Sequence, residues 1–198
     1  QFDTFYHEHP RTYSAKSFVH IAQKLKKELL FIEFPERYGG NIRAYIGLRK
    51  HHKLFPNLNL PDESNFSNKL LSLQPLISKW KKKCLNMIKT LIEENNKKPI
   101  AAKAFPGRAA ILIKLLSLDY DSIEAVYEIK GSIKTGNYVP GTRIPILPEK
   151  ELYESKYNGP ILNLAWHLPF EVRENLSKNG FKGKVYDIIS NELIVHED

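Results

Sequence analysis

The sequence predicts an α/β protein with three parts: a small amino-terminal piece of one helix and two strands, a helical connector, and an open parallel sheet. Short apolar runs alternate with amphipathic segments through the second half of the chain, and an apolar stripe at helical spacing precedes them. A segment rich in proline and asparagine separates that stripe from the first part. We expect the parts to span residues 1–53, 54–97 and 98–198.

The amino-terminal piece opens with a helix signal at Ser14. Serine caps helices well, and the apolar residues that follow share one face, so a helix is expected over residues 14–28. Apolar runs then predict buried strands over residues 29–34 and 41–48, joined by a turn that contains Gly39 and Gly40.

The connector begins with residues 54–61 and continues as a helical region that Pro75 interrupts or restarts. Beyond Pro75, apolar side chains recur at helical spacing, which predicts a long amphipathic helix. These side chains are Ile77, Trp80, Cys84, Met87, Ile88 and Leu91. Because Cys84 shares this apolar face, it is expected to be a small buried hydrophobe rather than a nucleophile.

The third part alternates strand and helix patterns, which is typical of a Rossmann-like open parallel sheet. The expected strands cover residues 100–105, 123–129, 161–166 and 184–189, and the expected helices cover residues 108–116, 148–154 and 170–178.

The net charge of +8 implies attraction to polyanions, namely nucleic acid, a membrane surface or a phosphorylated small molecule. No nucleic-acid-binding motif accompanies the charge, so nucleic acid is not the expected partner. No apolar stretch approaches the ~20 residues that cross a bilayer, so no membrane partner is expected either. The single cysteine, Cys84, fits a reducing compartment, and we expect a cytoplasmic protein.

A first candidate site is the loop at residues 105–110, between an expected strand and an expected helix. A helix amino terminus presents unpaired N–H groups, Gly107 allows close backbone approach, and Arg108 can grip a phosphate with two hydrogen bonds. A plain strand-to-helix turn explains the glycine equally well.

A second candidate is the sequence Tyr-His-Glu-His at residues 6–9. A histidine can take a proton at neutral pH, a carboxylate can orient it, and a tyrosine can hydrogen-bond a developing oxyanion. His7 and His9 are also potential metal ligands, but no third ligand stands at a diagnostic spacing, so no metal is expected. A polar surface segment is the plain alternative.

A third candidate is the long loop at residues 134–146, which contains two glycines and two prolines. Long ordered loops often carry function, and a rigid crossover between strand and helix is the competing interpretation.

These segments, in this order, resemble the sugar C-methyltransferases that act on dTDP-linked or similarly linked 4-keto-deoxysugars. Residues 2–9 resemble the family's Tyr-His-Glu-His segment, and residues 39–43 resemble its His-Gly-Gly-Ser-Leu-Arg turn. Residues 134–146 reproduce its Lys-x-Gly-x-Tyr-x-Pro-Gly-Thr-x-Ile-Pro-Ile segment position by position. Residues 164–166, with Glu171, resemble its Leu-Ala-Trp-Asn and downstream glutamate.

The resemblance implies an S-adenosylmethionine-dependent enzyme of deoxysugar biosynthesis whose substrate is a nucleotide-diphosphate sugar. It implies that His9 is the base, that Glu8 orients His9 or contacts the sugar, and that Tyr6 binds or stabilises the enolate oxygen. It further implies substrate contacts from Arg43, Gly107, Arg108, Lys134 and Tyr138. Residues 98–198 would form the family's Rossmann-like C-terminal domain, and residues 1–53 the end of its catalytic region.

The family also has an amino-terminal zinc-binding module and a methyl-donor domain, which this chain does not match. We therefore expect the chain to be cut from a longer protein and to lack the donor site.

The sequence departs from the family pattern at several positions. Tyr38 replaces the family's histidine, and Ala109 and Ala110 replace its glycine and asparagine. Ile129 and Lys130 stand where an aspartate is usual, and His167 replaces an asparagine. A non-catalytic sugar-nucleotide-binding module and a basic nucleic-acid-binding protein remain the alternatives.

Overall fold

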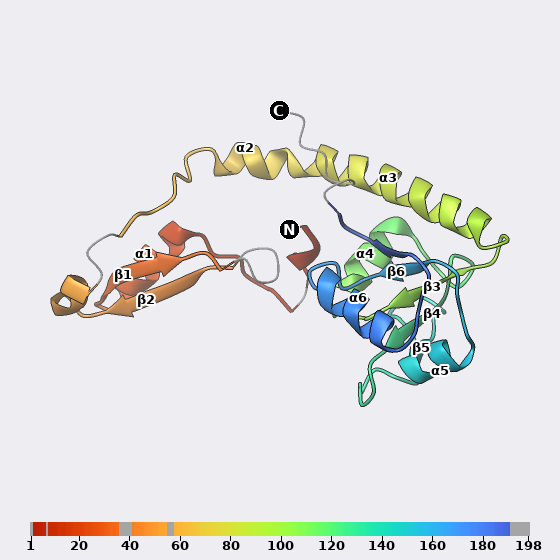
Figure 1. Ribbon diagram of the computed structural model, residues 1–198. Helices are drawn as coiled ribbons and strands as arrows, with labels where there is room; N and C mark the ends of the chain where they lie inside the picture. The colour runs from red at the N-terminus through yellow and green to blue at the C-terminus, as the bar shows by residue number, and fades with distance from the viewer. Residues whose placement is uncertain (1, 7, 36–40, 55–57, 191–198) are drawn as a thin grey trace. The chain divides into compact units, whose positions relative to one another are not determined.

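The structure is a computed structural model that describes residues 2–6, 8–35, 41–54 and 58–190. The chain forms two compact units (Figure 1). Unit 1 runs over His7–Leu73, and unit 2 joins Phe2–Tyr6 to Gln74–Asp198. Each unit has buried apolar residues of its own, so each is described by itself.

Unit 1 is built on helix α1 (Ala15–Lys24) and an antiparallel pair of strands, β1 (Glu28–Glu33) and β2 (Arg43–Gly47). Ser14 begins α1 through a capping box with Ser17, as the helix signal in the sequence predicts. The unit also contains the 3-10 helix η3 (Arg49–Leu54) and helix α2 (Phe66–Leu71).

Unit 2 holds a five-stranded parallel sheet in the order β5-β4-β3-β6-β7. The strands are β3 (Ile100–Lys103), β4 (Ile123–Glu128), β5 (Ile146–Pro148), β6 (Ile161–Asn163) and β7 (Val185–Asp187). The chain enters the sheet at its centre, moves outward to β5, and then returns to the other side of β3. This strand order confirms the predicted Rossmann-like α/β fold class.

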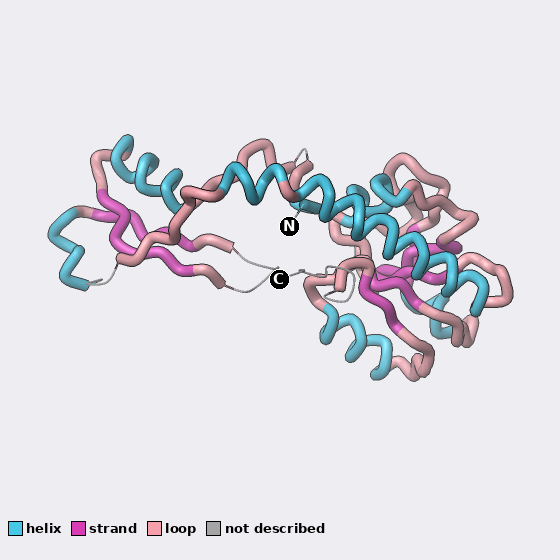
Figure 2. Tube along the Cα trace, turned by 90° about the horizontal axis from the view of Figure 1, so that it is seen from above, coloured by secondary structure: helices cyan, strands magenta, loops and turns pink. Residues whose placement is uncertain are grey.

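Two helices cover each face of the sheet in unit 2 (Figures 1 and 2). One face carries α3 (Leu73–Glu94) and α4 (Ala109–Leu116), and the other carries α5 (Glu149–Glu154) and α6 (Pro169–Lys178). The short 3-10 helix η1 (Phe2–Thr4) packs against α4.

Helix α3 confirms the apolar stripe that the sequence predicts. Its buried side chains Trp80, Cys84 and Ile88 join the core against the sheet. The Trp80 indole N–H donates to the Ile188 carbonyl at 2.9 Å, which ties α3 to the end of the sheet. Burial raises the pKa of the Cys84 thiol to about 12, so this sulfur is not a nucleophile at neutral pH.

The sheet contains one strand that was not predicted, and three of its strands are clearly shorter than predicted. Strand β3 ends at Lys103 rather than at 105, and β7 spans Val185–Asp187 rather than 184–189. Strand β5 was not predicted. It has only three residues, it follows Pro145 and it ends in Pro148, so it lacks a strand pattern. Strand β6 ends at Asn163 rather than at 166, because the Asn163 side chain accepts a hydrogen bond from the Ala165 N–H and turns the chain. The turn at Tyr38 to Gly40 and part of the segment 54–61 lie outside the described residues.

No helix in the described part of the chain combines the length and the apolar character that a membrane span requires.

Candidate functional site

Two loops of unit 2 follow the neighbouring strands β3 and β6. From β3 the chain continues toward β4 on one side of the sheet, and from β6 it continues toward β7 on the other side. Residues 104–108 lead from β3 to α4, residues 164–168 lead from β6 to α6, and β3 pairs with β6. In open parallel sheets, ligands bind outside the carboxyl ends of the strands at such a switch point. We call these segments the switch-point loops, and the predicted residues Gly107 and Arg108 lie on the first of them.

The first switch-point loop is held from the side of β4. The Phe105 N–H donates to the carboxylate of Glu128, the buried last residue of β4. The Lys134 ammonium donates to the Phe105 carbonyl and lies 5.7 Å from the centre of the Phe105 ring. Ala104 adopts a φ of 63°, a left-handed conformation that marks a tight turn. Lys134 therefore lies against the loop that carries Gly107 and Arg108.

Arg108 connects the two switch-point loops. It is only 9% exposed, its Nε lies 3.6 Å from Asp3 Oδ2, and its guanidinium carbon lies 5.3 Å from the centre of the Trp166 ring. The Trp166 indole N–H donates to the same Asp3 oxygen at 2.8 Å. Arg108 thus forms an ion pair within the chain, and its contact with a substrate phosphate stays a prediction.

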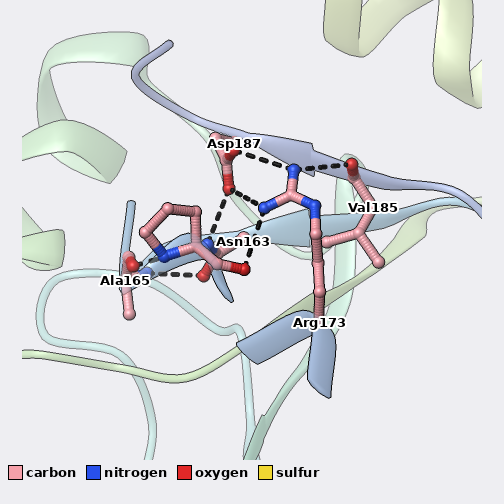
Figure 3. Close-up of polar contacts among 6 residues, drawn as sticks. Asn163, Ala165, Arg173, Val185 and Asp187 are labelled. Atoms are coloured by element: carbon pink, nitrogen blue, oxygen red, sulfur yellow. Dashed lines mark hydrogen bonds and ion pairs between the residues drawn. The ribbon is translucent and has the colours of Figure 1, made fainter. Parts of the chain in front are cut away.

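The second switch-point loop is fixed by a polar network at the ends of β6 and β7 (Figure 3). Asp187 accepts hydrogen bonds from both Nη atoms of Arg173, at 3.1 and 2.8 Å, and from the Asn163 amide at 2.7 Å. Asn163, which is fully buried, also accepts from the Ala165 N–H at 2.9 Å. The backbone next to Trp166 is therefore held by an ion pair between α6 and β7.

His167 is the titratable side chain of this loop. Burial lowers the pKa of His167 to about 4, and the positive charge of Arg108 adds to this effect, while Asp3 and Glu171 act in the opposite direction. His167 is therefore neutral at physiological pH and does not add to the cationic charge of the site.

The free energy of unfolding is expected to fall as the pH drops from 6.5 toward 4, because the unfolded chain then binds a proton that folded His167 does not. A shift of this size corresponds to about 3 kcal/mol for a fully buried group. Because the His167 ring is only partly buried, solvent screening lowers the expected loss to about 2 kcal/mol. Urea unfolding across this pH range measures it. His167→Asn should remove this component of the acid sensitivity. If the free energy of unfolding falls equally with pH in the wild type and in His167→Asn, His167 is not the group responsible.

The predicted catalytic residues are divided between the units. Tyr6 is half-buried in unit 2 and lies three residues beyond Asp3, so the chain limits the distance between their Cα atoms to about 11 Å. Glu8 and His9 are exposed residues of unit 1. His7 lies outside the described residues, and the catalytic roles of Tyr6, Glu8 and His9 stay predictions.

The remaining predicted substrate contacts are not on the switch-point loops: one belongs to unit 1 and the other to a different part of unit 2. Arg43 belongs to β2 of unit 1, where its Nη1 lies 2.5 Å from Glu33 Oε1 on the paired strand. Tyr138 is exposed in a surface hollow of about 720 Å³. That hollow is also lined by Tyr120 and Glu124, at the amino end of β4, whereas Gly107 follows the carboxyl end of β3.

Sequence reasoning missed Asp3 and Glu128 as members of this site. Asp3 belongs to the segment that resembles the family motif, but no local pattern links it to Arg108 or Trp166. Glu128 could have been found as the acidic residue that ends the second strand of a Rossmann-like sheet.

The strand order and the paired switch-point loops define unit 2 as a Rossmann-like α/β domain. A model of the C-methyltransferase C-terminal domain family matches residues 36–186 of the 198-residue chain, and the chain belongs to that family. No curated protein shows significant similarity to it. Within the described residues, no group of three or more His, Cys, Asp or Glu side chains could hold a metal ion.

Proposed function

We propose that this chain is the carboxyl-terminal part of an S-adenosylmethionine-dependent C-methyltransferase that acts on a nucleotide-linked 4-keto-deoxysugar. The family supports C-methyl transfer. The observation that carries the proposal is the contact of Asp3 with Arg108 and Trp166, because it brings the segment leading to Tyr6 to the switch-point loops. We also propose that residues 1–53 form the end of the catalytic region, residues 54–97 the connector and residues 98–198 the C-terminal domain.

The proposed role of the amino-terminal segment is proton abstraction. A hydrogen on the carbon beside the keto group is acidic because the resulting carbanion spreads its charge onto oxygen as an enolate. His9 takes this proton, Glu8 orients the imidazole or contacts the sugar, and Tyr6 donates a hydrogen bond to the enolate oxygen. The carbon then becomes nucleophilic toward a methyl group.

The methyl donor does not fit the described residues of unit 2. The loop after β3 has a single glycine, Gly107, and the side chains of Asp3, Arg108 and Trp166 contact one another at the switch point. Glu128, at the position that could hold a ribose, is buried and accepts the Phe105 N–H. We therefore assign the donor and the zinc module to other parts of the full-length enzyme.

The experiment that tests the proposal uses the full-length protein with a dTDP-4-keto-deoxysugar in deuterated water. Exchange of the hydrogen beside the ketone, followed by NMR without the methyl donor, reports proton abstraction alone. Adding S-adenosylmethionine should then give a product heavier by one methylene group. Sugar-nucleotide binding without exchange or methylation would identify a non-catalytic binding module instead.

Lys134→Ala is expected to raise KM for the sugar nucleotide about tenfold with a smaller effect on kcat, because we propose that Lys134, Gly107 and Arg108 meet the diphosphate. Lys130→Ala is the matched control, since Lys130 is an exposed lysine four positions earlier in the same loop. Steady-state kinetics of both variants measure the effect. Equal KM values for the two variants would remove Lys134 from the proposed site.

A further inference from the structure

Asp3 is a fully buried carboxylate in a short helix that packs against α4. Burying an ionised carboxylate costs several kcal/mol unless charges and hydrogen bonds compensate for the lost water. The neighbouring Phe2 is anchored differently, by its ring 4.9 Å from the ring of Trp80. Asp3 instead buries a carboxylate, and this burial calls for a physical explanation.

The surroundings of Asp3 form a site for an anion. Its Oδ2 accepts the Trp166 indole N–H at 2.8 Å and lies 3.6 Å from Arg108 Nε. The indole and the guanidinium come from the two switch-point loops, and Arg108 also precedes α4, whose amino-terminal dipole is positive. The groups that surround Asp3 are those that attract a phosphate or carboxylate in a parallel α/β fold.

The hydrogen bonds within this site are incomplete. Asp3 Oδ1 is buried and has no hydrogen-bond partner among the described residues. The first N–H groups of α4 donate to carbonyls of the preceding loop, with Ala109 N–H bonded to the Pro106 carbonyl at 2.8 Å. The Asp3 carboxylate is thus held mainly by charge and by one indole, as a ligand is held, rather than by a full set of backbone bonds.

We propose that the switch point of unit 2 is an anion-binding site and that the chain supplies its own ligand, the carboxylate of Asp3. Arg108 and Trp166 are then positioning residues that fix the segment leading to Tyr6. The site itself does not depend on the proposed function, whereas its effect on Tyr6 does. Because Asp3 engages Arg108, a substrate diphosphate must share that guanidinium, and Lys134 carries more of the phosphate contact.

The first test restores the missing carboxylate with a small anion. In the 198-residue chain, Asp3→Ala is expected to lower the midpoint of thermal unfolding by several degrees. Sodium formate should raise that midpoint saturably, beyond the effect of sodium chloride at equal ionic strength, because formate enters the space left by the side chain. Asp3→Asn should lose stability without this rescue, since the amide fills the same space.

Two proteins serve as controls, the wild type and Asp121→Ala, which removes an exposed carboxylate from the same unit. Neither should respond to formate more than to chloride. If formate stabilises Asp3→Ala no more than it stabilises these controls, Asp3 is not the occupant of an anion site, and the proposal is rejected.

A second measurement applies if Asp3→Ala does not fold. Asp3→Asn and Arg108→Met, singly and combined, form a double-mutant cycle in thermal unfolding. The combined variant should lose little more than the worse single variant, because each change already removes the ion pair. Fully additive losses would overturn the proposed ion pair.

The same variants distinguish this inference from the proposed function. In the full-length enzyme, Asp3→Ala should lose hydrogen exchange beside the ketone, and formate should restore part of it. A wild-type enzyme with no exchange, combined with formate rescue of folding, would contradict the methyltransferase proposal and leave the anion site intact. Exchange that Asp3→Ala retains in full would reject the positioning role.

Discussion

Glu149→Ala is expected to lower the free energy of unfolding by about 3–5 kcal/mol, because it leaves a buried ammonium group without its partner. Lys103, the last residue of β3, is 2% exposed, and its Nζ lies 2.7 Å from Glu149 Oε2 at the start of α5. Burial alone would raise the pKa of Glu149, but the hydrogen bond and charge of Lys103, together with hydrogen bonds from the Lys130 backbone and Tyr153, lower it. Urea unfolding at neutral pH measures the loss.

Two comparisons make this expectation specific. Glu154→Ala removes a surface partner of Lys150 from the same helix, 3.2 Å away, and should cost less than about 1 kcal/mol. Lys103→Met combined with Glu149→Leu should recover most of the stability, since an apolar pair avoids the buried charge. A loss for Glu149→Ala no larger than that for Glu154→Ala would show that the buried pair is not important for stability.

His9→Ala in the full-length enzyme is expected to slow hydrogen exchange and methyl transfer by about 10²–10⁴-fold, the usual contribution of a positioned general base. The effect should appear in kcat, with a small change in KM, because the imidazole acts on the reacting carbon rather than on the diphosphate. Kinetics with the sugar nucleotide measure both constants, and added imidazole should restore part of the rate.

The matched control is His20→Ala, which removes an exposed histidine from α1 of the same unit. It should keep the wild-type rate. Turnover retained by His9→Ala at the level of His20→Ala would reject His9 as the base and leave the family assignment in place.

The sequence predicted the architecture well where a single element carries its own pattern. Trp80, Cys84 and Ile88 mark one face of α3 by spacing alone, and Ser14 marks the beginning of α1. Strand β5 lacks such a pattern, because its three residues pair with β4 only when the loop before it returns to the sheet. Its existence depends on tertiary contacts rather than on local preference.

The candidate site could be predicted only in part for the same reason. Gly107 and Arg108 were located at a strand end because a strand-to-helix turn is a local feature. Asp3 and Trp166 stand 163 positions apart, so no pattern in the sequence could pair them. Tyr138 shares a motif with Lys134, yet the hairpin between Asn137 and Ile146 carries it to the other end of β4.

The contact between Asp3 and Trp166 also bears on the order in which the chain assembles during synthesis. A ribosome makes Asp3 long before the β6 loop, whose Trp166 indole N–H donates to this carboxylate. The neighbouring Ala165 N–H donates to Asn163, which in turn donates to Asp187 near the end of the sheet. The hydrogen bond from Trp166 can therefore complete the surroundings of Asp3 only after most of unit 2 has emerged, later than the ion pair with Arg108. Among the described residues, one of the earliest to be translated is among the last to complete its contacts.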